Sequence, residues 1–393
     1  MISVDEARAR ILNLAPKPVV ETIPLAEAAG RVLLQPLSAS RNQPPFAASA
    51  MDGYAARKAD LADGATLTVV GEAAAGSAWQ GQIGAGEALR IFTGAPLPGG
   101  ADCVIIQEDV QRSGNTITLG PGRDSADHIR PAGADFAKGW EFAAPRRLNP
   151  QDIALLAAMN HARLPVARKP VVALLPTGRE LVNVGDEPSD AQIISSNNLG
   201  LKALIEGAGG RARLLPIAPD TPEGLRACLA LCAGADLVVT LGGASVGDHD
   251  LVASVGQEAG LALDFYKIAM RPGKPLMAGR LNGIPMLGLP GNPVSSMVCG
   301  YVFLLPLLRA MLGLPQAGPG PRYPLAAPLP ANGPRSHFMR ARLIDGALHI
   351  QKRQDSALLS VLAESDILAI QPANGPALAV GDRLETLNLA ANG

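Results

Sequence analysis

The sequence predicts a multidomain protein of the α/β plus β class, and three observations lead to this prediction. Its 393 residues are more than a single domain with one hydrophobic core usually contains, and this length suffices for about two to four domains. Strand-like and helix-like segments alternate over residues 169–318, as they do in a doubly wound, mainly parallel sheet. Residues 43–140 and 319–393 instead carry short strand-like runs, which indicates two further β regions.

The N-terminal segment, residues 1–42, is expected to hold short helices and a strand. Ser3 and Glu6 have the spacing of a capping box at the start of its first helix. Another helix is predicted at residues 149–162, with Asn149 as its N-cap and Pro150 at its first position. The small β domain predicted between them contains the runs TLTVV, ALRIF, DCVIIQ and TITLG.

Buried strands are predicted within residues 169–318 at PVVALLPTG, ARLLPIAPD, ADLVVTLGG and IPMLGLPGNP. Helices are predicted between them at SNNLGLKALIEGAGG and TPEGLRACLALCAG, the second with Thr221 as its N-cap. Beyond a linker at residues 313–324, the runs ALHIQ, DILAIQP and DRLETLNL predict a small C-terminal β-barrel or sandwich.

The composition argues against several functional classes. The formal net charge is −1 and aromatic residues make up 3%, so neither electrostatics nor base stacking favours nucleic acid as a partner. The apolar stretch 293–313 has an uncharged run of about fifteen residues, short of a bilayer span, and is expected to be a core helix. The polar start MISVDEARAR does not resemble a signal peptide. We therefore expect a cytoplasmic protein without a membrane contact, and we expect buried thiols instead of zinc ligands from its cysteines.

A ligand is expected at the strand ends of the α/β region, because open parallel sheets bind ligands beyond the carboxyl ends of their strands. These ends carry Thr177-Gly178, Asp220 and the loops 242–245 and 290–295. Glycine and small hydroxyl residues let backbone N–H groups approach an anion closely. The loops together predict an anion-binding crevice, although any one of them is also explained as a tight turn.

Acidic and basic side chains accompany these loops. Carboxylates beside a phosphate cradle can hold Mg²⁺, and the candidates are Glu180, Asp220, Asp248 and Asp250. For Asp248 an N-cap is the favoured interpretation. Lys267, Arg271 and Lys274 fall within the single segment FYKIAMRPGKPLMAG, and their natural partner is phosphate or another oxyanion. The site is thus predicted to act through charge and metal, not covalent catalysis.

One carboxylate, Asp52, lies alone in the turn-prone segment PPFAASAMDGYAAR at residues 44–57. A carboxylate in such a segment can cap its own turn. It can also reach into a ligand site without desolvating other charges beside it.

Seven motifs occur in one order along the chain: SAMDGYA (49–55), IFTGAPLPGGADCVIIQED (91–109), RPAGAD (130–135), PTGREL (176–181), GGASVGDHD (242–250), MRPGKP (270–275) and GLPGNPVS (288–295). Together they resemble the molybdopterin molybdenumtransferases, the MoeA/gephyrin family, nearly end to end. The resemblance implies insertion of molybdate into adenylylated molybdopterin, with Mg²⁺-dependent cleavage of the pyrophosphate link and release of AMP.

The same resemblance implies a domain layout. Residues 1–42 and 141–168 would form one elongated, discontinuous domain, and residues 43–140 a β domain. Residues 169–318 would form a molybdopterin-binding α/β domain like that of MogA and MoaB, and residues 319–393 a C-terminal β-barrel domain. The family implies a homodimer, whose cleft lies between the α/β domain of one subunit and the β domain of the other.

Motif by motif, the resemblance also assigns residues. Asp52 would enter the neighbouring subunit's crevice, with Thr93 and Asp135 on the β-domain side, while Glu180, Asp220 and Asp250 would hold metal or pyrophosphate. The expected substrate-binding residues are Gly242, Gly243, Ser245, Lys267, Arg271, Lys274, Pro290, Asn292, Ser295, Arg340 and Ser356. Of these, Ser295, Arg340 and Ser356 would complete a molybdate pocket, and the three cations would bind the pterin phosphate and the incoming oxyanion.

Two positions depart from the family pattern. Arg271 stands where many members carry lysine, which changes a point donor into a fork. Arg179 stands where an acid is frequent, and we expect it to face solvent so that its charge does not weaken metal binding at Glu180.

Several alternatives remain open at this point. The chain could be the adenylyltransferase of the preceding step or a non-catalytic, gephyrin-like scaffold, and tungstate could replace molybdate. Asp52 could position either water or metal. The expected partners are a second copy of the chain and, transiently, the adenylyltransferase and the molybdoenzymes or their chaperones.

Overall fold

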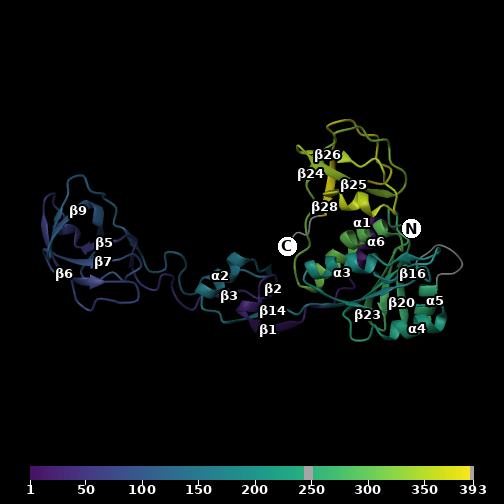
Figure 1. Ribbon diagram of the computed structural model, residues 1–393, viewed down its shortest axis with the longest axis horizontal. Coiled ribbons are helices and arrows are strands. Elements are labelled where there is room, and N and C mark those ends of the chain that lie inside the picture. The colour runs from purple at the N-terminus through teal and green to yellow at the C-terminus, as the bar shows by residue number, and fades with distance from the viewer. Residues whose placement is uncertain (243–250, 390–393) are drawn as a thin grey trace.

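The computed structural model describes residues 1–242 and 251–389, and Figure 1 shows that the chain is drawn out along one axis. A small β domain lies at one end of this axis. A small mixed segment lies in the middle, and an α/β domain with the C-terminal sheet beside it lies at the other end. The β domain and the α/β domain, which carry the two predicted halves of the site, therefore lie at opposite ends of the molecule.

The middle segment is built from parts of the chain on both sides of the β domain. Its sheet has the order β1-β14-β2-β13, from the strands Val20–Pro24, Arg163–Ala167, Val32–Leu33 and Arg146–Arg147. The helix α2 (Pro150–Ala158) covers it and begins with the predicted cap, a reciprocal pair between Asn149 and Asp152. Two short strands, β3 (Leu37–Ser38) and β12 (Glu141–Phe142), pair where the chain leaves and re-enters this segment.

The β domain is a six-stranded sheet of order β8-β5-β7-β6-β10-β9. Its strands are Cys103–Ile106, Gly53–Ala56, Glu87–Ile91, Thr66–Ala73, Thr116–Leu119 and Val110–Ser113. The four runs predicted as strands are confirmed, because each alternates buried and exposed side chains or lies wholly inside. A separate pair, β4 (Ala48–Ser49) with β11 (Ile129–Arg130), fastens the RPAGAD segment beside the residues that precede Asp52.

The α/β domain contains a six-stranded sheet of order β18-β15-β19-β23-β22-β20. The strands are Arg211–Leu214, Val171–Pro176, Leu237–Leu241, Ile284–Leu289, Met277–Leu281 and Leu261–Tyr266. The first four run parallel, as predicted. At one edge the reversed strand β22 pairs antiparallel with both β23 and β20. The strands are apolar over most of their length because both faces of the sheet are covered.

Helices pack on both faces of this sheet. One face is covered by α3 (Asn197–Gly207) and by the continuous stretch of α6 (Pro293–Cys299), η4 (Gly300–Leu304) and α7 (Leu305–Met311). The other face is covered by α4 (Pro222–Ala230) and α5 (Leu251–Glu258). The predicted cap of α4 is confirmed, since the Thr221 hydroxyl accepts from the Gly224 N–H at 3.1 Å. The doubly wound fold class is therefore confirmed.

One stretch among the described residues, Pro293–Met311, is long and apolar enough to cross a membrane, with a mean hydropathy of 1.6. It is longer than the run of about fifteen residues found in the sequence, because the helix continues through Arg309. Of its most apolar window, 67% is buried inside the protein. The stretch is accordingly a core helix of the α/β domain.

The N-terminal helix α1 (Val4–Leu12) belongs in space to the α/β domain. Its buried side chains Val4, Ala7 and Ile11 join the cluster that contains α3, α6 and α7. Its predicted cap is confirmed in part, because Ser3 accepts from the Glu6 N–H while the Glu6 carboxylate pairs with Arg10. The domain boundaries stay a prediction. Residues 1–42 were assigned to the discontinuous domain, but α1 packs on the α/β domain.

The C-terminal region has a curved sheet of order β21-β25-β27-β28-β24. Its strands are Met270–Arg271, Ser336–Ile344, Ile367–Gln371, Arg383–Asn388 and Arg322–Pro324; β26 (Ala347–Ile350) pairs with β25, and α8 (Leu359–Ala363) precedes β27. A bridge between Leu325 and Leu348 brings the chain after β24 to β26, which makes the sheet barrel-like. The strand β21 comes from the α/β domain, so the two regions share a sheet as well as a hydrophobic cluster.

Candidate active site

Asp52 is held at the end of the β domain by one neighbour, Thr93. The carboxylate atom Oδ1 accepts from the Thr93 backbone N–H at 2.8 Å and from the Thr93 hydroxyl at 2.7 Å. Both side chains are exposed. Asp52 therefore caps the turn of the TGAP motif and not its own turn, which brings two predicted site residues into direct contact.

The two hydrogen bonds stabilise the ionised form of Asp52. Bonds donated by the backbone and then the hydroxyl of Thr93 lower the pKa of the carboxyl group, and the nearby charge of Arg90 acts in the same direction. Asp52 is consequently ionised at neutral pH. Since both bonds go to Oδ1, and no bond to Oδ2 occurs in the described part of the chain, Oδ2 can bind a ligand.

The residue after Asp52, Gly53, has no room for a side chain. A Cβ atom added at Gly53 would lie 1.9 Å from the carbonyl oxygen of Ile105 on the neighbouring strand. The MDGYA motif thus needs glycine at this position, and the strand pairing of β5 fixes where Asp52 emerges. Asp135 is also exposed, and its N–H donates to the carbonyl of Gln43 at 2.9 Å. Within the residues described, Asp135 makes no direct bond to Asp52.

The carboxyl ends of three parallel strands meet in the α/β domain, as predicted. Thr177, after β15, donates its N–H to Leu241 at 2.9 Å, and Gly242, after β19, donates its N–H to Leu289 at 3.1 Å. Gly242 has a φ of +89°, and a Cβ atom there would lie 2.6 Å from the Thr177 carbonyl oxygen. The loop that begins at Pro290 follows β23, and its Gly291 lies against Gly242.

Two of the predicted metal ligands, Glu180 and Asp220, are exposed on adjacent loops of this edge. The Arg179 N–H donates to Asp220 Oδ2 at 3.2 Å, which ties the loops together. The Arg179 residue is exposed, as expected. The third ligand, Asp250, lies outside the described residues together with Gly243 and Ser245.

This donor set suits one kind of metal site. Where the structure is described, no group of three or more His, Cys, Asp or Glu side chains could enclose a metal. Mg²⁺, however, usually takes one or two protein carboxylates and completes its shell with water and substrate phosphate. Glu180 and Asp220 therefore fit a Mg²⁺ ion that binds with a phosphate ligand, and do not form a preformed cage.

The three predicted cations lie on the connection between β20 and β22 of the α/β domain, whose short strand β21 pairs with β25 of the C-terminal sheet. Lys267 has a φ of +72°, a left-handed conformation that is uncommon for lysine. The loop closes because Ile268 donates its N–H to the Lys274 carbonyl at 3.0 Å. Arg271 is exposed on β21, in register with His337 of β25.

The C-terminal region contacts the loop after β23 through Ser356. Its carbonyl oxygen accepts from the Val294 N–H at 3.0 Å, and its hydroxyl accepts from the Asn292 side-chain amide at 3.1 Å. Ser295 follows in the first turn of α6 and is buried. The structure thus brings Asn292, Ser295 and Ser356 to one place, although Ser356 is separated from the others by about sixty residues of chain.

Arg340 is the largest side chain buried at this junction, and it is only 1% exposed. Its Nη1 donates to the Asp355 carbonyl at 2.8 Å and its Nε to the Gln354 side-chain oxygen at 3.1 Å. Its Nη2 is buried and has no hydrogen-bond partner. Burial lowers the pKa of Arg340, although a guanidinium stays charged at neutral pH. Within the described residues the guanidinium is thus hydrogen-bonded only to neutral oxygens, and the nearby Asp355 carboxylate, which acts to raise the pKa of Arg340, makes no ion pair with it.

His337 is a residue of this junction that sequence reasoning missed. Burial lowers its pKa to about 4, and the charges of Arg271, Arg340 and Arg335 act in the same direction. The imidazole is therefore neutral at neutral pH and adds no charge beside the arginines. Only the pairing of β21 with β25 places it there, and that pairing has no local sequence signal.

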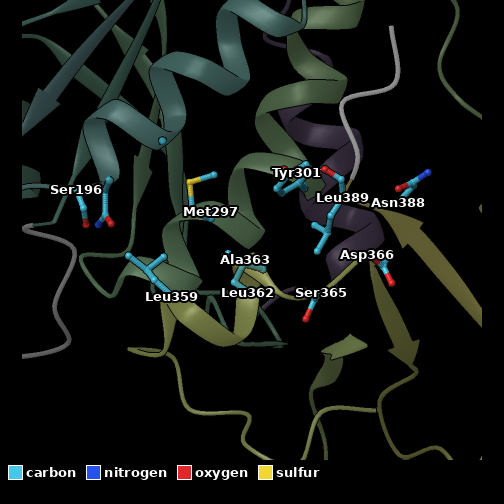
Figure 2. Close-up of a pocket in the computed structure, with 12 residues that line it drawn as sticks. Ser196, Met297, Tyr301, Leu359, Leu362, Ala363, Ser365, Asp366, Asn388 and Leu389 are labelled. Atoms are coloured by element: carbon cyan, nitrogen blue, oxygen red, sulfur yellow. Dashed lines mark hydrogen bonds between the residues drawn. The ribbon is translucent and has the colours of Figure 1, made fainter. Parts of the chain in front are cut away.

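A pocket of about 560 Å³ opens beside this junction, between α3, the helical stretch after Pro293 and α8 (Figure 2). Met297, Leu359 and Leu362 form apolar parts of its wall. Asn197, at one end, donates its side-chain amide to the Gly291 carbonyl at 2.8 Å and so connects the pocket to the loop 290–295. The volume is that of a small-molecule site, and none of the predicted site residues that the structure describes lines it.

In one chain, the two groups of predicted residues do not meet. Asp52 precedes β5 at one end of the molecule, and Glu180 precedes β16 (Leu181–Val182) at the other (Figure 1). The roles assigned to individual residues stay predictions.

Three family models match the chain in the order of its domains. They are the MoeA N-terminal region (domain I and II) over residues 2–160, the probable molybdopterin binding domain over residues 173–310 and the MoeA C-terminal region (domain IV) over residues 322–389.

Two similar proteins are named molybdopterin molybdenumtransferase. The molybdopterin molybdenumtransferase of Haemophilus influenzae is 38% identical over 320 residues, which cover 80% of this chain and 79% of the relative. That of Nostoc sp. is 32% identical over 411 residues, covering 99% and 94%. A solved structure of the molybdopterin biosynthesis MoeA protein of Pyrococcus horikoshii, 28% identical, superposes with a TM-score of 0.84 over 98% of this chain and 100% of its own.

Proposed function

This chain belongs to the molybdopterin molybdenumtransferase family of molybdenum cofactor biosynthesis, and we propose that it inserts molybdate into adenylylated molybdopterin with release of AMP. One observation carries the proposal. The guanidinium of Arg340 is buried beside Ser356 and the loop 290–295, with a free N–H and no carboxylate paired to it in the described residues. A buried, unpaired charge is unfavourable by several kcal/mol, so a buried oxyanion such as molybdate is its natural partner.

The cations on the neighbouring loop would bind the phosphates of the substrate. Lys267 and Lys274 are held close by the closed backbone of residues 267–276, and Arg271 presents its fork from β21. Such fixed positive charges stabilise the negative charge that develops during phosphoryl transfer, which is the main source of rate in this class of reaction.

Glu180 and Asp220 would hold Mg²⁺ together with the pyrophosphate of the substrate, as their two exposed carboxylates allow. When bound, the ion would neutralise charge on the phosphate oxygens. Asp52, whose ionised form is stabilised by its bonds to Thr93, would position either the attacking water or the metal. Water would then form a bond to the adenylyl phosphorus as the pyrophosphate bond breaks, leaving AMP and the phosphate of molybdopterin.

The protein is proposed to act as a cytoplasmic homodimer. The support is geometric: Asp52 and Glu180 lie at opposite ends of one chain (Figure 1), so a second chain is needed to bring such residues together. Each site would combine the β domain of one subunit with the α/β domain of the other. Transient contacts with the adenylyltransferase and with molybdoenzymes or their chaperones are proposed on the family resemblance alone.

The reaction can be tested directly with purified protein, adenylylated molybdopterin, molybdate and Mg²⁺. We expect AMP release and, in the same mixture, a molybdenum-containing dithiolene. AMP formation should depend on molybdate and Mg²⁺, and each is left out in turn as a control. Formation of adenylylated product from ATP and molybdopterin would instead support the adenylyltransferase, and no turnover in either mixture would support a scaffold.

The shared site predicts complementation between two inactive variants. Asp52→Asn and Arg340→Met affect different halves of the proposed cleft. Subunits mixed and allowed to exchange at random should recover about a quarter of wild-type activity, because half of the dimers are mixed and one of their two sites is intact. If each variant affected a site within one chain, the mixture would stay as inactive as its components, and exchange itself is checked by mass spectrometry of differently tagged subunits.

A further inference from the structure

The side chain of Gln354 is bonded to Arg340 on both sides of its amide. Its Oε1 accepts from the Arg340 N–H at 3.0 Å and from Arg340 Nε at 3.1 Å. Its Nε2 donates to the Arg340 carbonyl at 2.9 Å and to the Gln351 carbonyl at 2.8 Å. A glutamine amide can accept two and donate two hydrogen bonds, so this amide is fully used.

These bonds leave the guanidinium fixed in orientation while its charge is not neutralised. Nε is bound by Gln354 and Nη1 by the Asp355 carbonyl, so the group cannot rotate without breaking both bonds. Both partners are neutral, and Nη2 is left without a partner. A carboxylate at position 354 would hold the same atom but would neutralise the charge that an oxyanion needs.

The segment that holds Arg340 also carries Ser356. Residues 354 and 355 bond the guanidinium, and the next residue bonds Asn292 and Val294 across the domain junction. One short segment therefore sets the position of Arg340 relative to the loop 290–295.

We propose that Gln354 is a positioning residue of the molybdate site, which fixes Arg340 while its Nη2 makes no hydrogen bond to the described residues and no carboxylate is hydrogen-bonded to the guanidinium. The inference rests on the proposed function, in which Arg340 binds molybdate. Residues that orient a ligand-binding group in this way typically change affinity by roughly 10- to 100-fold when they are replaced.

The test compares Gln354→Met and Gln354→Glu with Gln371→Met in the full-length protein. Gln371 is a buried glutamine in the same sheet whose amide donates to the Pro330 carbonyl at 2.9 Å, and no hydrogen bond joins it to Arg340 in the described part of the chain. Binding of inorganic molybdate is measured by calorimetry, and AMP release gives the KM values for molybdate and for adenylylated molybdopterin.

We expect Gln354→Met to weaken molybdate binding by roughly tenfold or more, with the KM for adenylylated molybdopterin little changed. Gln354→Glu should weaken molybdate binding further, because its carboxylate neutralises Arg340. The Gln371→Met variant should lower stability and leave molybdate affinity unchanged. A purely structural role of Gln354 would instead lower the folded fraction and change both KM values together.

The inference is overturned if folded Gln354→Met and Gln354→Glu bind molybdate within about twofold of the wild type, or if the wild type binds none. A failure of the proposed function looks different, because then the wild type would release no molybdate-dependent AMP while the calorimetric comparison still stands. If Gln354→Met does not fold, Gln354→Glu, which keeps the two acceptor contacts to Arg340, carries the same comparison.

Discussion

Asp52→Asn is expected to slow AMP release by roughly 100- to 10,000-fold at saturating substrate, the range of a positioned acid–base or orienting group. The amide keeps the size of the side chain and can still accept from Thr93, so the fold should be unaffected. What is lost is the negative charge at the atom that is free to bind water or metal. The measurement is single-turnover AMP release, with a thermal unfolding curve to confirm that the variant is folded.

A matched control for this variant is Asp63→Asn. Asp63 is another exposed carboxylate of the β domain, and it pairs with Arg123 at 2.6 Å. Its replacement should leave AMP release close to that of the wild type. Full AMP release by Asp52→Asn would show that the carboxylate has no catalytic role.

Thr93 gives the same hypothesis a pH signature. Its hydrogen bonds lower the pKa of Asp52, and Thr93→Val removes the one from the hydroxyl. The pKa of Asp52 should then rise toward its ordinary value. If ionised Asp52 is required, the acidic limb of the pH–rate profile moves to higher pH in Thr93→Val and stays in place in Thr93→Ser.

The second large effect is expected for Arg340→Met, which removes the buried charge and keeps an unbranched side chain. Losing a buried charged partner weakens binding by about 2–5 kcal/mol, or roughly 30- to 5,000-fold in molybdate affinity. The free energy of unfolding should change little, because removing a buried charge that has no ion-pair partner offsets the loss of its hydrogen bonds to Gln354 and the Asp355 carbonyl. Calorimetry with molybdate and urea unfolding measure the two quantities separately.

Arg342→Met is the matched control, since Arg342 lies on the same strand and is exposed. It should leave both molybdate affinity and stability nearly unchanged. The oxyanion role of Arg340 would be wrong if Arg340→Met bound molybdate as tightly as Arg342→Met does.

Local features of the fold were predictable from the sequence. Caps such as Asn149 and Thr221, and the strand-like runs of the β domain, depend on residues within a few positions of one another. The anion-binding loops could also be placed, because parallel strands align their carboxyl ends at one edge. The seven motifs predicted the family, and through it a role for Arg340 and Ser356.

Other features depend on contacts between distant segments. The helix α1 packs on the α/β domain through Val4 and Ile11, and the two residues of β21 extend a sheet that otherwise comes from the last eighty or so residues. Neither α1 nor β21 has a local sequence pattern that predicts which segment it packs against or pairs with. The environments of His337 and Gln354 follow from these contacts, and for this reason sequence reasoning found neither residue.

The sequence by itself determined the helix caps, the strands of the β domain and the alternation that builds the parallel part of the α/β sheet, because these follow from local periodicity and chemistry. Only the tertiary structure decided that Asp52 is bound by Thr93, that Arg340 is buried with its charge unpaired and that one chain separates Asp52 from Glu180. The physical reason is that burial and hydrogen-bond satisfaction are properties of packed neighbours, and these neighbours lie far apart along the chain.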